Sequence, residues 1–213
     1  MAGVVVIVPV LDRPQRVQPF CEALYENSPV GAVRALFVVD PGDRAELDAV
    51  FAAGEDVLVH GGSYAAKVNA AVEVTDEPLL FFAADDLEFR PLWLRNALQR
   101  LVDPIQVVGV NDLLKRRRRH ATHFLVTRDY AQQPTIDGQP GPLCTAYQHS
   151  FVDDEFIATA RARGVYAYAS DAHVEHLHPM NGRSVDDATY RKGRGTFKAD
   201  RRIFQQRFQL WAT

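Results

Sequence analysis

The chain has 213 residues, of which 47% are hydrophobic and 24% are charged, and its formal net charge is −3. This length fits one large α/β domain, or one domain with a tail, and allows a sizeable core. The slightly acidic balance excludes bulk attraction to nucleic acid or membranes, so any polyanion must bind locally. Cys21 and Cys144 lack metal-type spacing, as is typical of reduced thiols in a cytoplasmic protein.

The first half of the sequence alternates strand-like and helix-like patterns. Apolar runs predict strands at 4–10, 35–40, 56–60 and 78–84, and helical spacing predicts a helix after each of the first three. Pro19 favours a start of the first helix later than Pro14. The opening run is too short to span a bilayer and lacks the charged start of a signal peptide. Strands apolar on both faces and alternating with helices predict a parallel sheet covered on both sides.

The second half predicts a mixed sheet and a helical end. Residues 92–101 and 151–163 have helical patterns, 105–110 and 166–170 are strand-like, and 120–127 alternates as an antiparallel strand does. The turn-rich stretch 134–142 predicts a surface loop. We therefore expect a domain at 1–185 and a helical tail at 186–213. The tail's apolar residues predict packing on the domain or on a second copy, in a homo-oligomer: Phe197, Ile203, Phe204 and Phe208.

Carboxylates follow two of the predicted strands. Asp85 and Asp86 end the strand at 78–84, and adjacent carboxylates repel each other unless a cation or hydrogen bonds hold them. A hard divalent metal suits such a pair, although the two residues can also cap a turn. Asp40 ends the second strand at the same predicted edge, where it could bind a base or ribose, or only form a turn before Pro41 and Gly42.

Further along the chain, Lys67 and Asn69 lie in a small-residue helix, where they could meet a diphosphate or simply face solvent. His173, His176 and His178 surround a predicted strand end, and imidazole binds divalent metals, although a histidine is more often a hydrogen-bonded structural residue.

Two charged segments have both a structural and a functional interpretation. Asp153, Asp154 and Glu155 begin a predicted helix, where acidic residues cap the helix, and one of them could be a general base. The basic run at 115–119 is either a solvated loop or a clamp for phosphates of a donor or of a polyanionic acceptor such as modified DNA, through Arg116, Arg117, Arg118 and Arg119.

Taken in order, these segments resemble family 2 glycosyltransferases with the GT-A fold, especially the compact versions of actinobacteria and their phages. The resemblance covers about residues 4 to 180. Its segments are VVVIVPVLDRP, ALFVVDPGD, AAKVNAAVEVTDEPLLFFAADDLEF, VDDEFIATARARG and VEHLHP. It implies a mixed, mainly parallel sheet with helices on both faces. The cytoplasmic location that the two thiols indicate would be the host cytoplasm for a phage protein.

The resemblance implies a nucleotide-diphosphate-sugar donor, Mn²⁺ or Mg²⁺, and transfer with inversion. It assigns donor binding to Pro9, Val10, Asp12, Arg13, Asp40, Lys67, Asn69 and Asp85. It assigns the metal to Asp85, Asp86, His176 and His178, and the base to Asp153, with Glu155 as the alternative base. The usual DxD signature reads AADD here, which leaves open which aspartate contacts the metal.

Two other functions remain open from the sequence. A sugar nucleotidyltransferase also uses carboxylate-bound Mg²⁺, but the glycine-rich loop that such an enzyme needs after strand one is absent from VPVLDRPQR. A non-catalytic module that binds a nucleotide or glycan is the other alternative. The acceptor could be a glycan, a protein, a small molecule or a hydroxylated DNA base.

Overall fold

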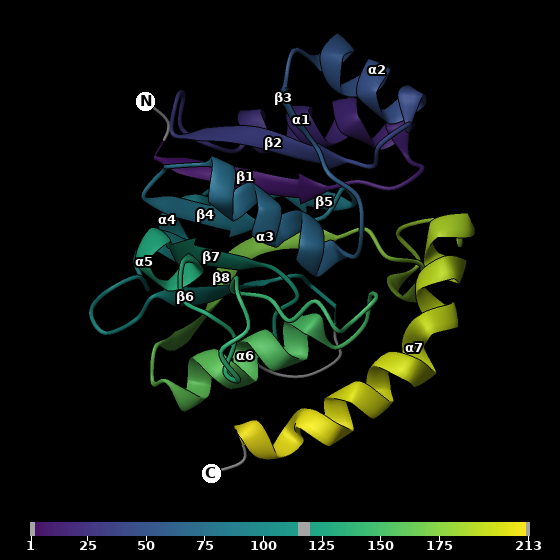
Figure 1. The fold of residues 1–213 in the computed structure, drawn as a ribbon. Helices are drawn as coiled ribbons and strands as arrows, with labels where there is room; N and C mark the ends of the chain where they lie inside the picture. The colour runs from purple at the N-terminus through teal and green to yellow at the C-terminus, as the bar shows by residue number, and fades with distance from the viewer. Residues whose placement is uncertain (1–2, 115–119, 212–213) are drawn as a thin grey trace.

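A computed structural model describes residues 3–114 and 120–211. The arginines at 116–119 lie outside the described residues, so the prediction about them stays a prediction. In the described ranges, eight strands form one sheet in the order β3-β2-β1-β4-β7-β6-β8-β5 (Figure 1). The strands are β1 (Val4–Pro9), β2 (Val33–Val39), β3 (Asp56–Val59), β4 (Leu79–Phe82), β5 (Leu87–Phe89), β6 (Val107–Asn111), β7 (Phe124–Thr127) and β8 (Tyr166–His176).

The helices connect these strands largely where the sequence predicts them. A short 3-10 turn at Pro14–Arg16 precedes the first α-helix, so Pro19 falls in that helix's first turn, where a proline removes no helical hydrogen bond. The helix therefore starts later than Pro14, as predicted. The α-helices are α1 (Val17–Glu26), α2 (Arg44–Ala53), α3 (Tyr64–Val74), α4 (Trp93–Leu98), α5 (Arg128–Ala131), α6 (Val152–Ala162) and α7 (Ala188–Arg207).

The sheet is mixed, which confirms the prediction. Strands β3, β2, β1 and β4 run parallel, β7 pairs antiparallel with both β4 and β6, and β6 runs parallel to β8. Two reversals around β7 restore the original direction, so β6 and β8 run the same way as β1. The carboxyl ends of all these strands except β7 therefore lie at one edge of the sheet, where α/β proteins bind their ligands.

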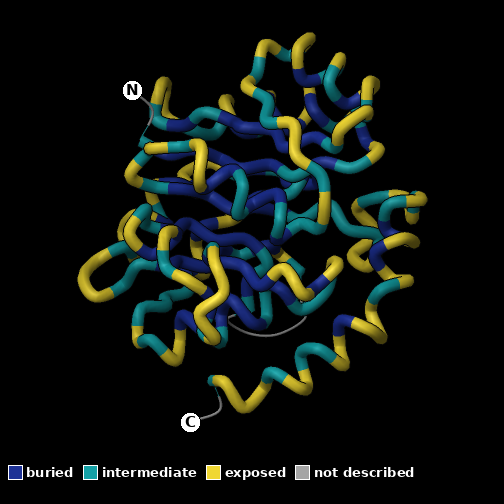
Figure 2. Tube along the Cα trace, in the orientation of Figure 1, coloured by how far each residue is buried: buried dark blue, intermediate teal, exposed yellow. Residues whose placement is uncertain are grey.

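Each face of the sheet has its own hydrophobic core. Successive side chains of β1 alternate between the two faces because a strand has a period of two. Val4, Val6 and Val8 pack with α1 and α4, whereas Val5 and Ile7 pack with α3 and α6. All five side chains are buried, which explains why this strand is apolar without interruption. Figure 2 shows the buried strands through the middle of the molecule.

The C-terminal helix α7 is an outlying helix that runs along one side of the molecule and ends beneath α6 (Figure 1). The Phe151 ring at the start of α6 contacts Phe197 and Phe204 of α7, with ring centroids 5.1 and 5.2 Å apart. Gly193 lies so close to His149 that an added Cβ would approach the imidazole to 2.6 Å. The described helices include none that is both long and apolar enough to cross a membrane.

Candidate functional site

The residues that the sequence singles out gather at the carboxyl edge of the sheet. Arg13 follows β1, Asp40 follows β2, and Asp85 and Asp86 follow β4. His176 is the last residue of β8. Asp153 lies in the first turn of α6, and because α6 leads into β8 and packs on it, its start faces the same edge.

Arg13 is the centre of a buried ionic cluster. Its Nη1 atom lies 3.0 Å from Asp85 Oδ1 and 3.4 Å from Asp86 Oδ2. Its Nε and Nη2 atoms donate to the two carboxylate oxygens of Asp187, the residue before α7, at 2.9 and 3.0 Å. The guanidinium also stacks on the Tyr190 ring, 4.0 Å from its centroid. Burial disfavours the charge, but the carboxylates outweigh it and hold the pKa of Arg13 above its usual value.

Asp86 has three partners of different kinds. Besides Arg13, it accepts a 2.6 Å hydrogen bond from the Tyr190 hydroxyl, and His176 Nε2 lies 3.2 Å from its Oδ1 atom. Burial raises the pKa of Asp86, but His176, Tyr190 and Arg13 outweigh it and hold that pKa well below its usual range. Burial lowers the pKa of His176, and Asp86 outweighs it and raises that pKa. Asp86 is therefore ionised.

Several buried ligand atoms beside this cluster have no hydrogen-bond partner among the described residues. They are Asp85 Oδ2, Asp86 Oδ1 and His176 Nδ1. Asp86 Oδ1 and His176 Nε2 approach each other without the alignment of a hydrogen bond. A buried carboxylate oxygen without a partner is costly, and a divalent cation is one group that satisfies it. The Asp86–His176 pair therefore fits a metal of the Mn²⁺ or Mg²⁺ kind.

His178 and His123 complete the surroundings of this pair. The His178 ring lies 5.2 Å from that of His176, and its Nδ1 atom accepts a hydrogen bond from the Met180 amide. The His123 ring lies 5.2 Å from His176 on another side. Burial first, and then His176, lowers the pKa of His123 to about 3, while Asp86 and Asp153 both act to raise it. His123 is therefore neutral and has both carboxylates within electrostatic reach.

Lys67 and Asp40 form the second group at this edge. Lys67 is buried, and its Nζ atom donates to Asp40 and, at 2.7 Å, to the Val10 carbonyl oxygen. These contacts tie α3 to the ends of β1 and β2. Pro9 is the last residue of β1 and is half-buried, whereas Asp12 is exposed and has a positive φ of 55°. The loop after β1 thus turns sharply between the Lys67 contact and Arg13.

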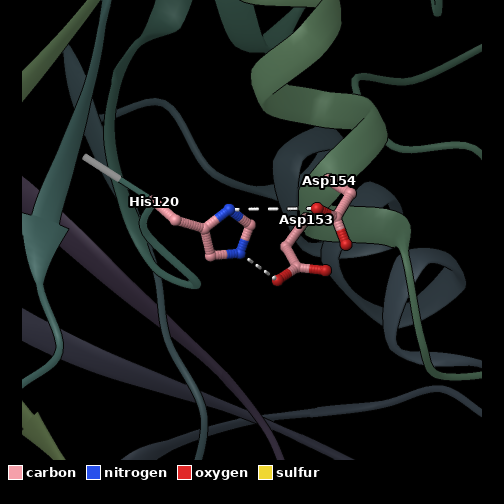
Figure 3. Close-up of side chains that lie close together, drawn as sticks. All are labelled: His120, Asp153 and Asp154. Carbon is pink, nitrogen blue, oxygen red and sulfur yellow. Dashed lines mark ion pairs between the residues drawn. The ribbon is translucent and has the colours of Figure 1, made fainter. Parts of the chain in front are cut away.

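Asp153 pairs with His120 in the segment before β7, as Figure 3 shows. His120 Nε2 lies 3.4 Å from Asp153 Oδ2, and its Nδ1 lies 3.8 Å from Asp154 Oδ1. Burial raises the pKa of Asp153, but His120 outweighs it and holds that pKa below its usual value. Asp153 raises the pKa of His120 in return. The three side chains also have the donor types and spacing of a small metal site.

Two predicted site residues have structural partners instead. Glu155 is buried and accepts hydrogen bonds from Tyr147 and, through both carboxylate oxygens, from Arg207 of α7. Asn69 donates to the Leu143 carbonyl at 2.8 Å and accepts from the Leu143 amide at 3.1 Å. These contacts hold Glu155 against α7 and Asn69 against the loop before α6.

Two open cavities flank the site. One, of about 510 Å³, lies between α1 and β5 and reaches Asp85, with Arg16 and Leu177 in its wall. The other, of about 670 Å³, lies against the outer face of β8. His173 lines this second cavity, away from His176.

Sequence reasoning missed Tyr190, Asp187 and His120. Asp187 is the N-cap of α7, and its side chain accepts a hydrogen bond from the Tyr190 amide. A capping residue in the sequence predicts where a helix starts, but not which other residues the helix contacts. His120 borders the basic run and carries no pattern that links it to Asp153.

Comparison with known proteins is informative only at the level of structure. The sequence matches no known protein family and no curated protein. One similar solved structure is glucosyl-3-phosphoglycerate synthase from Mycobacterium tuberculosis in complex with Mn²⁺, UDP and phosphoglyceric acid. It shares 12% identity at a TM-score of 0.62, with 85% of this chain and 74% of that chain covered.

Another similar structure is a mannosyltransferase from Pyrobaculum calidifontis in complex with GDP-Man and Mn²⁺. It shares 16% identity at a TM-score of 0.66, with 85% of this chain covered. The alignment spans 58% of the mannosyltransferase chain. At these identities the likeness concerns the fold, and the chain has the GT-A fold of these transferases.

Proposed function

We propose that this chain is a metal-dependent glycosyltransferase of the family 2 type, which moves a sugar from a nucleotide diphosphate to an acceptor hydroxyl with inversion. The observation that carries the proposal is the pairing of Asp86 with His176 at the carboxyl edge of a GT-A sheet, the edge at which α6 begins with Asp153 in its first turn. The proposed metal ligands and the proposed proton acceptor thus lie at one edge of the sheet.

Asp86 and His176 would hold the divalent cation, with Asp85 and His178 beside them. The cation would act as a Lewis acid that neutralises the leaving diphosphate. Arg13 already lies against Asp85 and Asp86, so its guanidinium is placed to contact phosphate oxygens of a bound donor. Support for the metal comes from the unpartnered ligand atoms of this cluster.

Lys67 and Asp40 would bind the nucleoside end of the donor. Asp40 is only partly buried and lies against Gly61, where an added Cβ would come within 3.4 Å of its Oδ1 atom, so its carboxylate can accept hydrogen bonds from a base or ribose. Lys67 holds Asp40 and the loop after β1 in place. Pro9, Val10 and Asp12 would line this end through the backbone of that loop.

Asp153 would act as the general base. It takes the proton of the acceptor hydroxyl as the oxygen forms a bond to the anomeric carbon, and the bond from that carbon to the diphosphate oxygen breaks. One displacement from the face opposite the leaving group inverts the anomeric centre. The low pKa of Asp153 keeps it ionised, and His120 holds the carboxylate in position.

The test of the metal assignment is Asp86→Ala. The variant should lose Mn²⁺-dependent binding of nucleoside diphosphate in calorimetry. It removes the Asp86 carboxylate and leaves the His176 imidazole as the other proposed ligand, which cannot hold the cation alone. Asp48→Ala, which removes an exposed carboxylate from α2, should bind as the wild type does. Equal binding by Asp86→Ala and the wild type would refute the assignment.

The test of inversion is the anomeric configuration of the product. A panel of nucleotide sugars, screened for Mn²⁺-dependent hydrolysis, gives the accepted donor. Proton NMR of the transferred sugar should then show the configuration opposite to that of the donor. A product with the donor's configuration would show retention and would remove the need for Asp153 as a base.

One observation favours a second candidate, a non-catalytic nucleotide-binding module. Arg13 places a guanidinium against both Asp85 and Asp86, in the position that a cation would take in a degenerate site. Such a module would bind nucleoside diphosphate equally well in EDTA and in Mn²⁺, and would hydrolyse no nucleotide sugar in the panel.

A further inference from the structure

Helix α7 carries a stripe of cations on the side that faces away from the domain. At 100° per residue, five basic residues fall within about 100° of arc on the helix. All five are exposed: Arg191, Arg194, Lys198, Arg201 and Arg202. Gly193 and Asp200, on the opposite side, are buried against the domain. Figure 2 shows the exposed segments that recur along this helix.

The stripe has a strong local charge in an acidic protein. The chain as a whole has a net charge of −3. Asp186 pairs with Arg194 at 2.7 Å and offsets one of the cations. The carboxylate of Asp200 is fully buried and accepts hydrogen bonds from three backbone amides, so it does not face the stripe. Lys198, Arg201 and Arg202 form no ion pair with the rest of the described chain.

The geometry points to a nucleic acid as the partner of this stripe. From Arg191 to Arg202 the helix rises about 16 Å. The same length of duplex axis carries roughly ten phosphate charges. A row of cations at this spacing can therefore contact several consecutive phosphates without reading the sequence of the bases.

The apolar face of α7 argues against a membrane surface. A helix that lies on a bilayer buries its apolar face among the lipids. In α7 that face is already in use, because Phe197 and Phe204 contact Phe151 and Ile203 packs on the same core. Phe208 and Leu210, which are exposed, lie in the 3-10 turn that follows α7. Phe197 keeps 45% of its surface exposed at the edge of the stripe, so binding to anionic vesicles is the outcome that the test has to exclude.

The stripe starts beside the candidate site. Arg191 follows Tyr190, whose hydroxyl donates to Asp86. We propose that the outer face of α7 binds the phosphate backbone of duplex DNA, which then lies along the helix with one part next to the sheet edge. This binding depends on α7 alone and does not require that the site transfers a sugar.

The test compares two triple variants of the full-length protein that remove the same charge. Lys198→Gln/Arg201→Gln/Arg202→Gln removes three cations of the stripe, and Arg44→Gln/Arg95→Gln/Arg100→Gln removes three exposed cations elsewhere. Binding of a fluorescein-labelled 20-base-pair duplex is measured by anisotropy between 25 and 200 mM NaCl. Circular dichroism checks that both variants fold.

The stripe variant should weaken DNA binding and reduce the slope of log K against log salt by about 2 to 3, while the control variant keeps the wild-type slope. The proposal is overturned if the two variants bind alike. It is also overturned if the wild type binds poly-glutamate or vesicles with 30% phosphatidylserine as tightly as the duplex. Calorimetry with Mn²⁺ and nucleoside diphosphate on the same variants reports the candidate site separately, so either proposal can fail alone.

Discussion

The three acidic residues that begin α6 have different surroundings. Asp153 and Asp154 face His120 at the sheet edge, whereas Glu155 points to the other side of the helix and binds Arg207 and Tyr147. Successive helical residues are 100° apart, so two positions suffice to move a carboxylate from the site to the packing side. The sequence alone shows three equivalent carboxylates, and only the neighbours separate them.

Asp153→Asn should test the base directly, because the N-cap of α6 is Phe151 and no side chain caps this helix. The amide keeps the shape of the side chain but cannot take a proton, so the variant should fold normally, bind nucleotide and lose transfer by roughly 10² to 10⁴-fold. Glu155→Gln should instead lower the free energy of unfolding by about 3 kcal/mol, because it breaks a buried pair with Arg207. Rate assays and urea denaturation measure the two effects. A stable but inactive Glu155→Gln would move the base to Glu155.

His120→Asn should change the pH profile of transfer. In the wild type, His120 holds the pKa of Asp153 below its usual value against burial. Without His120, burial prevails and the pKa rises, so the acid limb of kcat/KM should move to higher pH. The raised pKa of His120 also stabilises the fold at low pH, and this contribution disappears as pH rises through that pKa. An unchanged acid limb would show that His120 does not act on the base.

At the scale of elements, the structure confirms the strands and helices that a short apolar pattern within the element itself predicts. The strand predicted at 166–170 is longer in the structure, because β8 continues to His176. Its first part pairs with β6 and its second part with β5, across a register shift at Val110 and Asn111. Such pairing is decided by partners far away in the sequence, which a local pattern does not contain. The three-residue strand β5 was missed for the same reason.

Helix α7 orders the loop before α6 through one buried carboxylate. Asp200 accepts hydrogen bonds from the amides of residues 148, 149 and 150, at 2.8 to 3.0 Å. Asp200→Asn leaves one acceptor oxygen and places an amide donor against another donor, so it should destabilise the fold by about 1–3 kcal/mol. Burial raises the pKa of Asp200, but the amides outweigh it and lower that pKa.

Because the pKa of Asp200 is lowered in the folded state, its contribution is present at neutral pH and is lost as pH falls through that pKa. The difference in unfolding free energy between the wild type and Asp200→Asn should therefore shrink in acid. Urea denaturation at pH 7 and below pH 4 measures it. Asp48→Asn on the exposed side of α2 is the control. A gap that stays constant with pH would argue against the lowered pKa.

At the scale of the whole molecule, the topology brings distant parts of the chain together. The tail residues Asp187 and Tyr190 contact Arg13 and Asp86 across 174 and 104 positions. The sequence alone could place the residues that follow a parallel strand at the carboxyl edge of the sheet, because the direction of the strand fixes where its end lies. The tail could not be placed in this way, because its helical pattern does not indicate which edge of the sheet the helix crosses.

Nucleoside diphosphate with Mn²⁺ should stabilise the whole protein if the site is formed as proposed. A ligand that binds only the folded state adds about 2.7 kcal/mol at 100 times its Kd, so Tm should rise with ligand concentration. Differential scanning fluorimetry measures this shift, which should vanish in Asp86→Ala and in EDTA. A shift that persists in EDTA would place the nucleotide elsewhere.

Arg13 is a built-in counter-ion for Asp85 and Asp86. A free cation that enters the proposed site must compete with a guanidinium that the fold already holds there, whereas a cation that arrives with a diphosphate offers Arg13 a new anionic partner. Metal and nucleotide should therefore bind with positive cooperativity, each raising the affinity for the other by the same factor. Arg13→Met should abolish this cooperativity and let Mn²⁺ bind alone.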